Sequence, residues 1–295
     1  MNEAVTQAVP PIVTAPLAVN AFGLTDKGRV RSSNEDQFLI AELTKTMRIR
    51  HTSLPEPKAR FGNERGHLFL VADGMGGHQA GEQASAIAVV AIQHFTLNTF
   101  QWFFHADKPE AQRTLMQLQT ALHAADDRVL AESSGHPELR GMGTTLTLAY
   151  HLDAQLCVVH VGDSRAYIFK NDQLRQITHD DSVTAEMVRR GELDPRDVAT
   201  HVLRHVITNV VGGNEAGVHV EAHAMKVGEG DRLLLCSDGL TEMVTNEAIA
   251  AVLRAEPDPE AACRLLVAQA NAAGGRDNIT ALVARFDAGE APADR

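Results

Sequence analysis

Clustered basic residues are missing from this chain of 295 residues, whose net charge is −11. Proteins that bind nucleic acid or anionic membrane surfaces need clusters of Lys and Arg. No apolar stretch approaches the roughly 18–20 residues that a transmembrane helix requires. The sequence therefore predicts neither a nucleic-acid partner nor a membrane-spanning segment. We expect a monomer.

Cysteine is also scarce, with three residues, Cys157, Cys236 and Cys263. The first two lie in apolar strand-like runs and the third in a helical pattern. An odd number of cysteines without a spacing pattern is typical of reduced core thiols. The N-terminal residues include Glu3 but no Lys or Arg, which does not match a signal or transit peptide. We therefore expect a cytoplasmic protein.

Neither an internal repeat nor a linker rich in Gly, Ser or Pro divides the body of the chain, which we place at residues 21–287 as a single domain. Residues 1–20 and 288–295 are expected to form a disordered lead-in and a disordered tail. Apolar runs bounded by Gly, Asp or Asn predict strands, and apolar stripes at helical spacing predict helices. The predicted strands are Phe38–Ala41, His67–Ala72, Thr145–Tyr150, Leu156–Val161, Ala166–Phe169, Leu174–Ile177, Arg232–Cys236 and Thr280–Phe286, and the predicted helices cover 84–95, 115–129, 246–255 and 258–272.

Only a few residues separate consecutive strands between positions 156 and 177, and such short links are expected to permit only antiparallel neighbours. We therefore predict an α+β fold of largely antiparallel sheets with helices on their outer faces. Residues 42–66 interrupt this order as a long surface excursion. Residues 180–213 form a polar helical block in which Asp194 is placed as an N-cap before Pro195. This block could fold over a site.

Three strand-like segments meet a carboxylate at one end: LFLVADGMGGH, LLLCSDGL and RDNITALV. They contribute Asp73, Asp238 and Asp277, and the carbonyl of Gly74 adds a neutral oxygen. Such oxygen donors, drawn from distant parts of the chain, are the ligands that Mg²⁺ or Mn²⁺ prefers. Taken singly, the first two aspartates are also compatible with ordinary turns or caps, and Asp277 with an Asx-turn before its strand.

Three further charged residues, Arg31, Glu35 and Asp36, come just before a predicted strand. The arginine could hold a phosphate through two hydrogen bonds, beside carboxylates that order water. A solvated charged loop is the alternative. Asp163 is expected at a hairpin tip, where Asp is common in any case.

His78 lies five residues after Asp73 and could donate a proton to a leaving group, or it could simply begin a helix. The pairs His201–His205 and His219–His223 have the i, i+4 spacing that grips zinc on a helix. Neither pair carries the Glu of HExxH, and 14 histidines make such spacings common by chance. We assign no zinc site to them.

Taken in order, these segments resemble the motifs of the metal-dependent protein phosphatases of the 2C type, in their bacterial branch. The resemblance covers roughly residues 20–287. The motifs that carry it are GLTDKGRVRSSNED, LFLVADGMGGHQAGEQAS, GMGTTLTLAY, VVHVGDSRAYIF, ITHDDSV, LLLCSDGLTEMV and GGRDNITALVARF.

The resemblance implies an α-β-β-α sandwich and a site for two Mn²⁺ or Mg²⁺ ions. The two-metal site would consist of Asp73, the carbonyl of Gly74, Asp238 and Asp277. Glu35 and Asp36 would order metal-bound water, and Asp163 would bind a weaker third metal. Arg31 would hold the substrate phosphate, and His78 would protonate the leaving group.

The expected reaction is a direct in-line attack of an activated water on a phosphoserine or phosphothreonine ester of a protein. The resemblance suggests that this activity opposes a bacterial Ser/Thr kinase and its targets. Residues 180–213 resemble the family's flap, but Val202, His205 and Asn209 stand where bacterial relatives usually have Pro, Asn and Arg. The flap residues bear on substrate choice and on the third metal.

Two rival functions use the same fold. A non-catalytic sensing or binding module would be marked by loss of a metal carboxylate, whereas Asp73, Asp238 and Asp277 are all present. A hydrolase of small phosphoesters or nucleotides would share the chemistry, but the chain has no GxxxxGK[ST] loop. Phosphoprotein hydrolysis remains the leading prediction.

Overall fold

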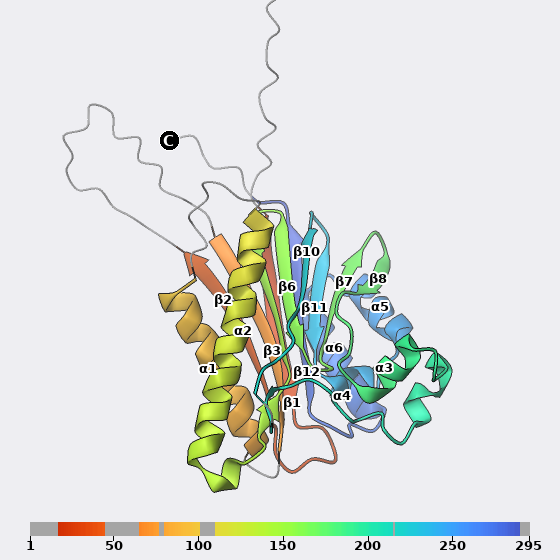
Figure 1. The fold of residues 1–295 in the computed structure, drawn as a ribbon. Helices are drawn as coiled ribbons and strands as arrows, with labels where there is room; N and C mark the ends of the chain where they lie inside the picture. The colour runs from red at the N-terminus through yellow and green to blue at the C-terminus, as the bar shows by residue number, and fades with distance from the viewer. Residues whose placement is uncertain (1–16, 45–64, 77–79, 101–109, 215, 290–295) are drawn as a thin grey trace, which may run out of the picture.

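Two antiparallel β-sheets pack face to face at the centre of the molecule (Figure 1). The computed structural model describes residues 17–44, 65–76, 80–100, 110–214 and 216–289. In one sheet the strand order is β1-β12-β11-β7-β8; in the other it is β10-β6-β5-β3-β4-β9, with β2 pairing β3. The strands of the first sheet are β1 (Ala18–Asp26), β7 (Arg165–Lys170), β8 (Gln173–Gln176), β11 (Arg232–Cys236) and β12 (Ile279–Asp287). The strands of the second are β2 (Asp36–Thr44), β3 (Arg65–Met75), β4 (Gly143–Thr144), β5 (Leu146–Leu152), β6 (Gln155–Val161), β9 (Val211–Gly212) and β10 (Glu221–Lys226).

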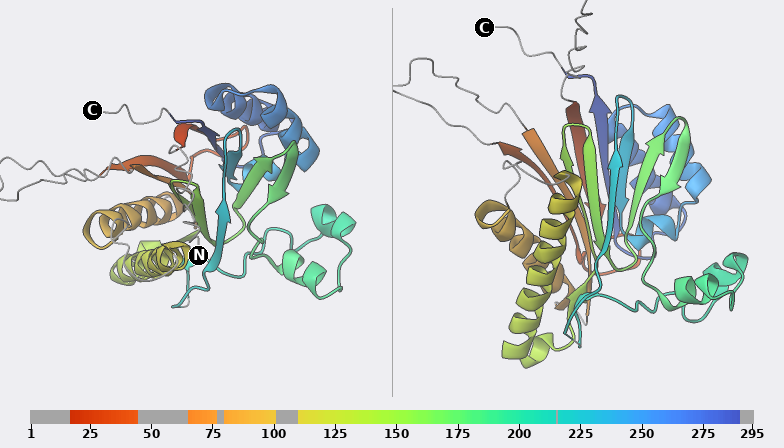
Figure 2. Two further views of the ribbon diagram at one scale, coloured as in Figure 1. Left: turned by 90° about the horizontal axis from the view of Figure 1, so that it is seen from above. Right: turned by 45° about the horizontal axis from the view of Figure 1, so that its top comes forward.

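Helices cover the two outer faces of this pair of sheets (Figure 2). The long helices α1 (Ala80–Asn98) and α2 (Glu110–Gly135) pack on the β3 sheet, and α5 (Asn246–Ala255) and α6 (Pro259–Ala272) pack on the β11 sheet. The short helix α4 (Asp238–Thr241) follows β11 directly. The predicted α-β-β-α sandwich is confirmed.

Strand β3 shows why its sequence is apolar on both sides. Leu68 and Leu70 belong to the core under α1 and α2, whereas Phe69 and Val71 belong to the core between the sheets. All four side chains are at most 2% exposed. Because successive side chains of a strand point to opposite faces, a strand covered on both faces must be apolar throughout.

The eight predicted strands and four predicted helices all correspond to observed elements, although Thr145, Ile177 and Asp258 each lie one residue outside them. The antiparallel link from β7 to β8 is confirmed. The prediction that β6 and β7 are hairpin neighbours is wrong, because residues 162–164 carry the chain from one sheet to the other. A short link between strands can cross a sandwich as well as turn back within one sheet.

The predicted boundary at residue 20 is also too late, since β1 begins at Ala18 and pairs with β12 over its whole length. Pairing with a buried strand orders a segment whose own composition is unremarkable. Most of the predicted excursion at 42–66 lies outside the described residues; β2 runs to Thr44 and β3 starts at Arg65. Residues 1–16 and 290–295 also lie outside them.

The block 180–213 contains α3 (Val183–Arg189) and a 3-10 helix, η2 (Pro195–Thr200), and extends away from the sandwich (Figure 2). The predicted cap is confirmed: the side chain of Asp194 accepts a hydrogen bond from the backbone N–H of Arg196, with Pro195 at the first helical position. The other 3-10 helix, η1 (Pro137–Leu139), follows α2. Within the described residues, none of the helices combines the length and apolar character needed to cross a bilayer.

Candidate active site

A cleft of about 600 Å³ gathers side chains from both sheets and from the block 180–213. Seven of the nine predicted site residues line it. These seven are Arg31, Glu35, Asp73, Gly74, Asp163, Asp238 and Asp277. The structure thus brings together residues that are up to 246 positions apart in the sequence. Asp36 lies buried behind the cleft wall, and His78 lies outside the described residues.

Asp73 lies where β3 changes partners. Up to Val71 the strand pairs with β5, and from Gly74 onward it pairs with the two-residue strand β4. Thr145 fixes the junction, because its hydroxyl accepts from the Asp73 amide at 2.9 Å and its own amide donates to the Asp73 carbonyl at 2.9 Å. The strand therefore continues past the carboxylate rather than ending at it, and the Asp73 backbone is held from both sides.

Gly74 follows Asp73 and Gly239 follows Asp238, and at both positions a neighbouring backbone leaves no room for a side chain. A side-chain carbon at Gly74 would lie 2.1 Å from the carbonyl oxygen of Gly81 in α1. One at Gly239 would lie 2.0 Å from the carbonyl oxygen of Asn278. Both distances are far below van der Waals contact, so each Asp-Gly pair lets the neighbouring backbone approach the site closely.

Asp277 and Arg31 form an ion pair at the mouth of the cleft. Arg31 Nη2 lies 2.6 Å from Asp277 Oδ2, and the arginine side chain is 57% exposed. The other oxygen of Asp277 accepts from the next backbone amide, that of Asn278, at 2.8 Å. This hydrogen bond comes from the next residue along the chain, whereas in an Asx-turn the side chain accepts from the residue two positions ahead. The aspartate is thus fixed locally while the arginine remains accessible to an anion.

Asp36 is 2% exposed and directly opposite Asp73 in the β2–β3 pairing. Its Oδ2 accepts hydrogen bonds from the hydroxyls of Ser237 and Thr280, each at 2.7 Å. Its Oδ1 has no partner among the described residues, and the same holds for Asp238 Oδ1. Unpartnered carboxylate oxygens in buried positions are costly unless a ligand satisfies them.

Asp163 lies in the crossover between β6 and β7, and the segment after β8 braces that crossover on both sides. Asp181 Oδ2 accepts from the backbone amide of Gly162 at 3.0 Å. Asp180 binds the guanidinium of Arg165 through both oxygens, at 2.8 and 2.6 Å. The position of Asp163 is therefore set by two residues that the sequence analysis left without a role.

The electrostatics of the cleft are those of a cation site. Burial raises the pKa of Asp73 and of Asp238 well above the usual range, and neighbouring carboxylates raise both further. Burial, followed by the charge of Asp180, raises the pKa of Asp163 to about 7. Closely packed carboxylates repel one another, and two of these have a buried oxygen without a partner. A bound divalent cation would neutralise them. The donor set is carboxylate and carbonyl oxygen, which fits Mg²⁺ or Mn²⁺.

Asn278 and Glu242 of this region were missed by the sequence analysis, which named His205 as a flap residue but not its contact with Glu242. Asn278, which is 5% exposed, accepts from the Glu35 amide and donates to the carbonyls of Lys27 and Ser33. Its position in RDN, next to Asp277, was the available signal. Glu242 and His205 also line the cleft, with His205 Nδ1 2.9 Å from Glu242 Oε1. Nothing in their spacing predicts this contact, because only the fold brings the two segments together.

The sequence model of the protein phosphatase 2C family matches residues 58–270. The serine/threonine phosphatase Stp of Listeria innocua is 32% identical over 88% of this chain and 92% of its own. The serine/threonine protein phosphatase PstP of Mycobacterium tuberculosis is 34% identical over 88% of this chain, which spans 43% of the length of that relative. A crystal structure of the PstP catalytic domain in complex with two manganese ions covers 92% of this chain and 99% of its own, with 30% identity and a TM-score of 0.72. This chain belongs to the protein phosphatase 2C family.

Proposed function

We propose that this protein is a metal-dependent serine/threonine phosphoprotein phosphatase. The observation that carries the proposal is the cleft itself, in which carboxylates from both sheets converge beside an accessible arginine. Membership of the protein phosphatase 2C family supports it, as do relatives that are named serine/threonine phosphatases. The manganese ions of the PstP structure support a site for two Mn²⁺ or Mg²⁺ ions.

In this proposal Asp73, the carbonyl of Gly74, Asp238 and Asp277 would hold the metal ions, with Asp163 at a weaker third position. Bound divalent cations lower the pKa of water and neutralise phosphate charge. Asp36, anchored through Oδ2 by Ser237 and Thr280, keeps Oδ1 available to orient a water.

Substrate handling would fall to side chains at the mouth of the cleft. Arg31 can donate to two phosphate oxygens, and its present partner Asp277 keeps it aimed at the cleft. Glu35, whose pKa is raised chiefly by burial, lies beside it as a further water-ordering group. His78 remains the proposed donor of a proton to the leaving group.

The finer parts of the proposal concern partners and location. We propose that the substrates are phosphoserine and phosphothreonine proteins, including a bacterial Ser/Thr kinase and its targets. We also propose that the enzyme is a monomer with one catalytic domain that runs from β1, at Ala18, to the end of β12, at Asp287. A cytoplasmic location is supported by the three cysteines, which are all buried and form no disulfide.

The proposal is tested by hydrolysis of a phosphothreonine peptide in Mn²⁺ and in EDTA, with a nucleotide as the competing substrate. We expect turnover of the peptide that needs the metal and returns when Mn²⁺ is restored. A folded protein that binds Mn²⁺ without turnover would favour the non-catalytic module, and preference for the nucleotide would favour the small-phosphoester hydrolase.

A further inference from the structure

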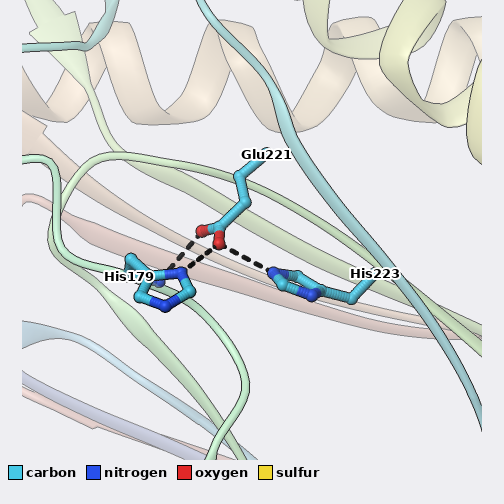
Figure 3. A group of neighbouring side chains, drawn as sticks. All are labelled: His179, Glu221 and His223. Carbon is cyan, nitrogen blue, oxygen red and sulfur yellow. Dashed lines mark hydrogen bonds and ion pairs between the residues drawn. The ribbon is translucent and has the colours of Figure 1, made fainter.

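Away from the acidic cleft, two imidazoles converge on a single carboxylate oxygen (Figure 3). His179 Nδ1 lies 2.5 Å and His223 Nε2 2.7 Å from Glu221 Oε1. Glu221 and His223 belong to β10, two residues apart and therefore on the same face of that strand. His179 comes from the segment after β8, 42 residues before Glu221. None of these three residues lines the acidic cleft.

The carboxylate is already oriented for a ligand at this oxygen. The backbone amide of His179 donates to Glu221 Oε2 at 2.9 Å, which leaves Oε1 toward both imidazoles. Burial favours the neutral carboxyl, but the hydrogen bonds from His179 and His223 outweigh it and lower the pKa of Glu221. Glu221 is thus an ionised acceptor fixed by the backbone.

His160, a nearby histidine, differs from His179 and His223 because its imidazole is held inside the protein. His160, opposite Glu221 in the β6–β10 pairing, is fully buried. Its Nδ1 lies 2.8 Å from the Thr147 hydroxyl, and its Nε2 lies 2.9 Å from the Gly162 carbonyl. Both ring nitrogens of His160 are engaged inside the protein, whereas His179 and His223 are 69% and 28% exposed. Their site is open to an incoming ion.

We propose that His179, Glu221 and His223 form a second metal site, one that takes Zn²⁺. Two imidazoles and one carboxylate are the three-ligand set of open zinc sites, in which a water or another group completes the tetrahedron. The three candidate ligand atoms lie within 4.8 Å of one another. Bonds of about 2.0–2.1 Å in a tetrahedron place ligand atoms about 3.3 Å apart, so the ion requires both imidazoles to move away from Glu221 Oε1, each by less than about 1 Å. Two imidazole donors distinguish this site from the acidic cleft, where the proposed metal ligands are carboxylate and carbonyl oxygens that prefer harder ions and His205 is the one imidazole of the lining.

Zinc here would join the edge strand β10 to the segment 177–182. That segment contains Asp180 and Asp181, which brace the crossover that carries Asp163. A bound ion would therefore stabilise the folded state and tie this segment to the sheet.

The experiment uses the full chain, stripped of metal and then kept in excess Mg²⁺ to occupy the acidic cleft. Zn²⁺ is titrated in competition with a chromophoric zinc indicator, and Tm is followed with and without Zn²⁺. We expect His179→Ala and Glu221→Gln each to weaken binding of one equivalent of zinc at least ~10-fold. Their Tm values without zinc should match that of the wild type, because His179 is largely exposed and Gln keeps the shape of Glu221.

The matched control is His219→Ala, which removes an exposed imidazole four residues from His223 and leaves the cluster intact. It should keep the zinc equivalent and the zinc-dependent rise in Tm. Equal zinc binding by the wild type and both cluster variants would overturn the proposal, as would a wild type that binds no zinc under these conditions. In either case the cluster would be an ion pair that only joins two segments.

Discussion

Two regions of this protein bury polar atoms that have no hydrogen-bond partner among the described residues. One region borders a cavity, and the other lies in the packed core between the sheets. At the acidic cleft, Oδ1 of Asp238, which lines the cavity, and Oδ1 of Asp36, which is buried behind its wall, are both unpartnered. Between the sheets, both ring nitrogens of His151 are unpartnered, and its ring packs on Phe286 at 4.6 Å. The first atoms border a cavity that a cation can enter, whereas the ring of His151 is packed against Phe286 and His67. An unsatisfied polar atom indicates function only where a cavity gives a ligand access.

The largest effect is expected from Asp238→Asn, which tests the cleft side of the comparison. The amide removes a carboxylate from the proposed metal site, so kcat/KM for a phosphothreonine peptide should fall on the order of 10³-fold. Stability without metal should be unchanged or higher, because one charge leaves a repulsive cluster. The control is Asp153→Asn, the same change at an exposed turn position with φ 53°, which Asn tolerates. Wild-type turnover in Asp238→Asn would refute the proposed ligand.

Arg31→Ala should rank second, lowering kcat/KM about 10²-fold, because the phosphate loses its charged donor. Arg31→Lys should recover only part of this, since an ammonium lacks the planar pair of donors. The matched variant is Arg29→Ala, two residues away in the same exposed loop and outside the cleft lining. Equal kinetics for Arg31→Ala and Arg29→Ala would exclude a role in binding phosphate.

Asn278→Ala tests a buried polar side chain at the cleft whose amide, unlike Asp36 and Asp238, has hydrogen-bond partners for both its oxygen and its nitrogen. The change leaves three backbone groups without their partner and should cost about 2–3 kcal/mol of unfolding free energy. We expect turnover to fall about tenfold as Glu35 and its loop loosen. Urea unfolding and peptide kinetics measure both, with Asn98→Ala at an exposed helix end as the control. Loss of stability without loss of turnover would make Asn278 purely structural.

His151→Phe tests the core side and should have the smallest effect at neutral pH, a gain of about 1 kcal/mol from removing unpaired nitrogens. Burial, helped by the nearby His67, lowers the pKa of His151 from 6.5 to about 4. The unfolded chain therefore binds an extra proton between these values, and wild-type stability falls as the pH drops through that window. At pH 5 the variant should gain about 2 kcal/mol more than at pH 8.

Urea unfolding at pH 5 and pH 8 measures this difference, and His123→Phe, at an exposed position of α2, is the control. The same gain at both pH values would show that His151 finds a partner or a proton in the folded protein. Peptide turnover should be unaffected at pH 8, because His151 does not line the cleft. This separates a buried polar atom that costs stability from one that serves the site.

The sequence predicted the elements well because their signals are local. Apolar runs ended by Gly, Asp or Asn marked eight strands, and Asp194-Pro195 marked a helix start that the structure confirms. The resemblance to the 2C-type phosphatases implied the α-β-β-α class and the common site of seven residues that the structure gathers in one cleft. The local signals were simpler: a carboxylate at the end of a strand, or a glycine beside it.

Pairing across distance was decided by the tertiary structure alone. The link from β6 to β7 looks like a hairpin in the sequence but crosses between sheets, and β1 gains its order from β12 at the far end of the chain. The i, i+4 histidine pairs proved uninformative, because His223 is in a strand and meets His179 instead. Spacing along a chain reports neighbours only within one regular element, whereas contacts between elements depend on how their buried faces pack.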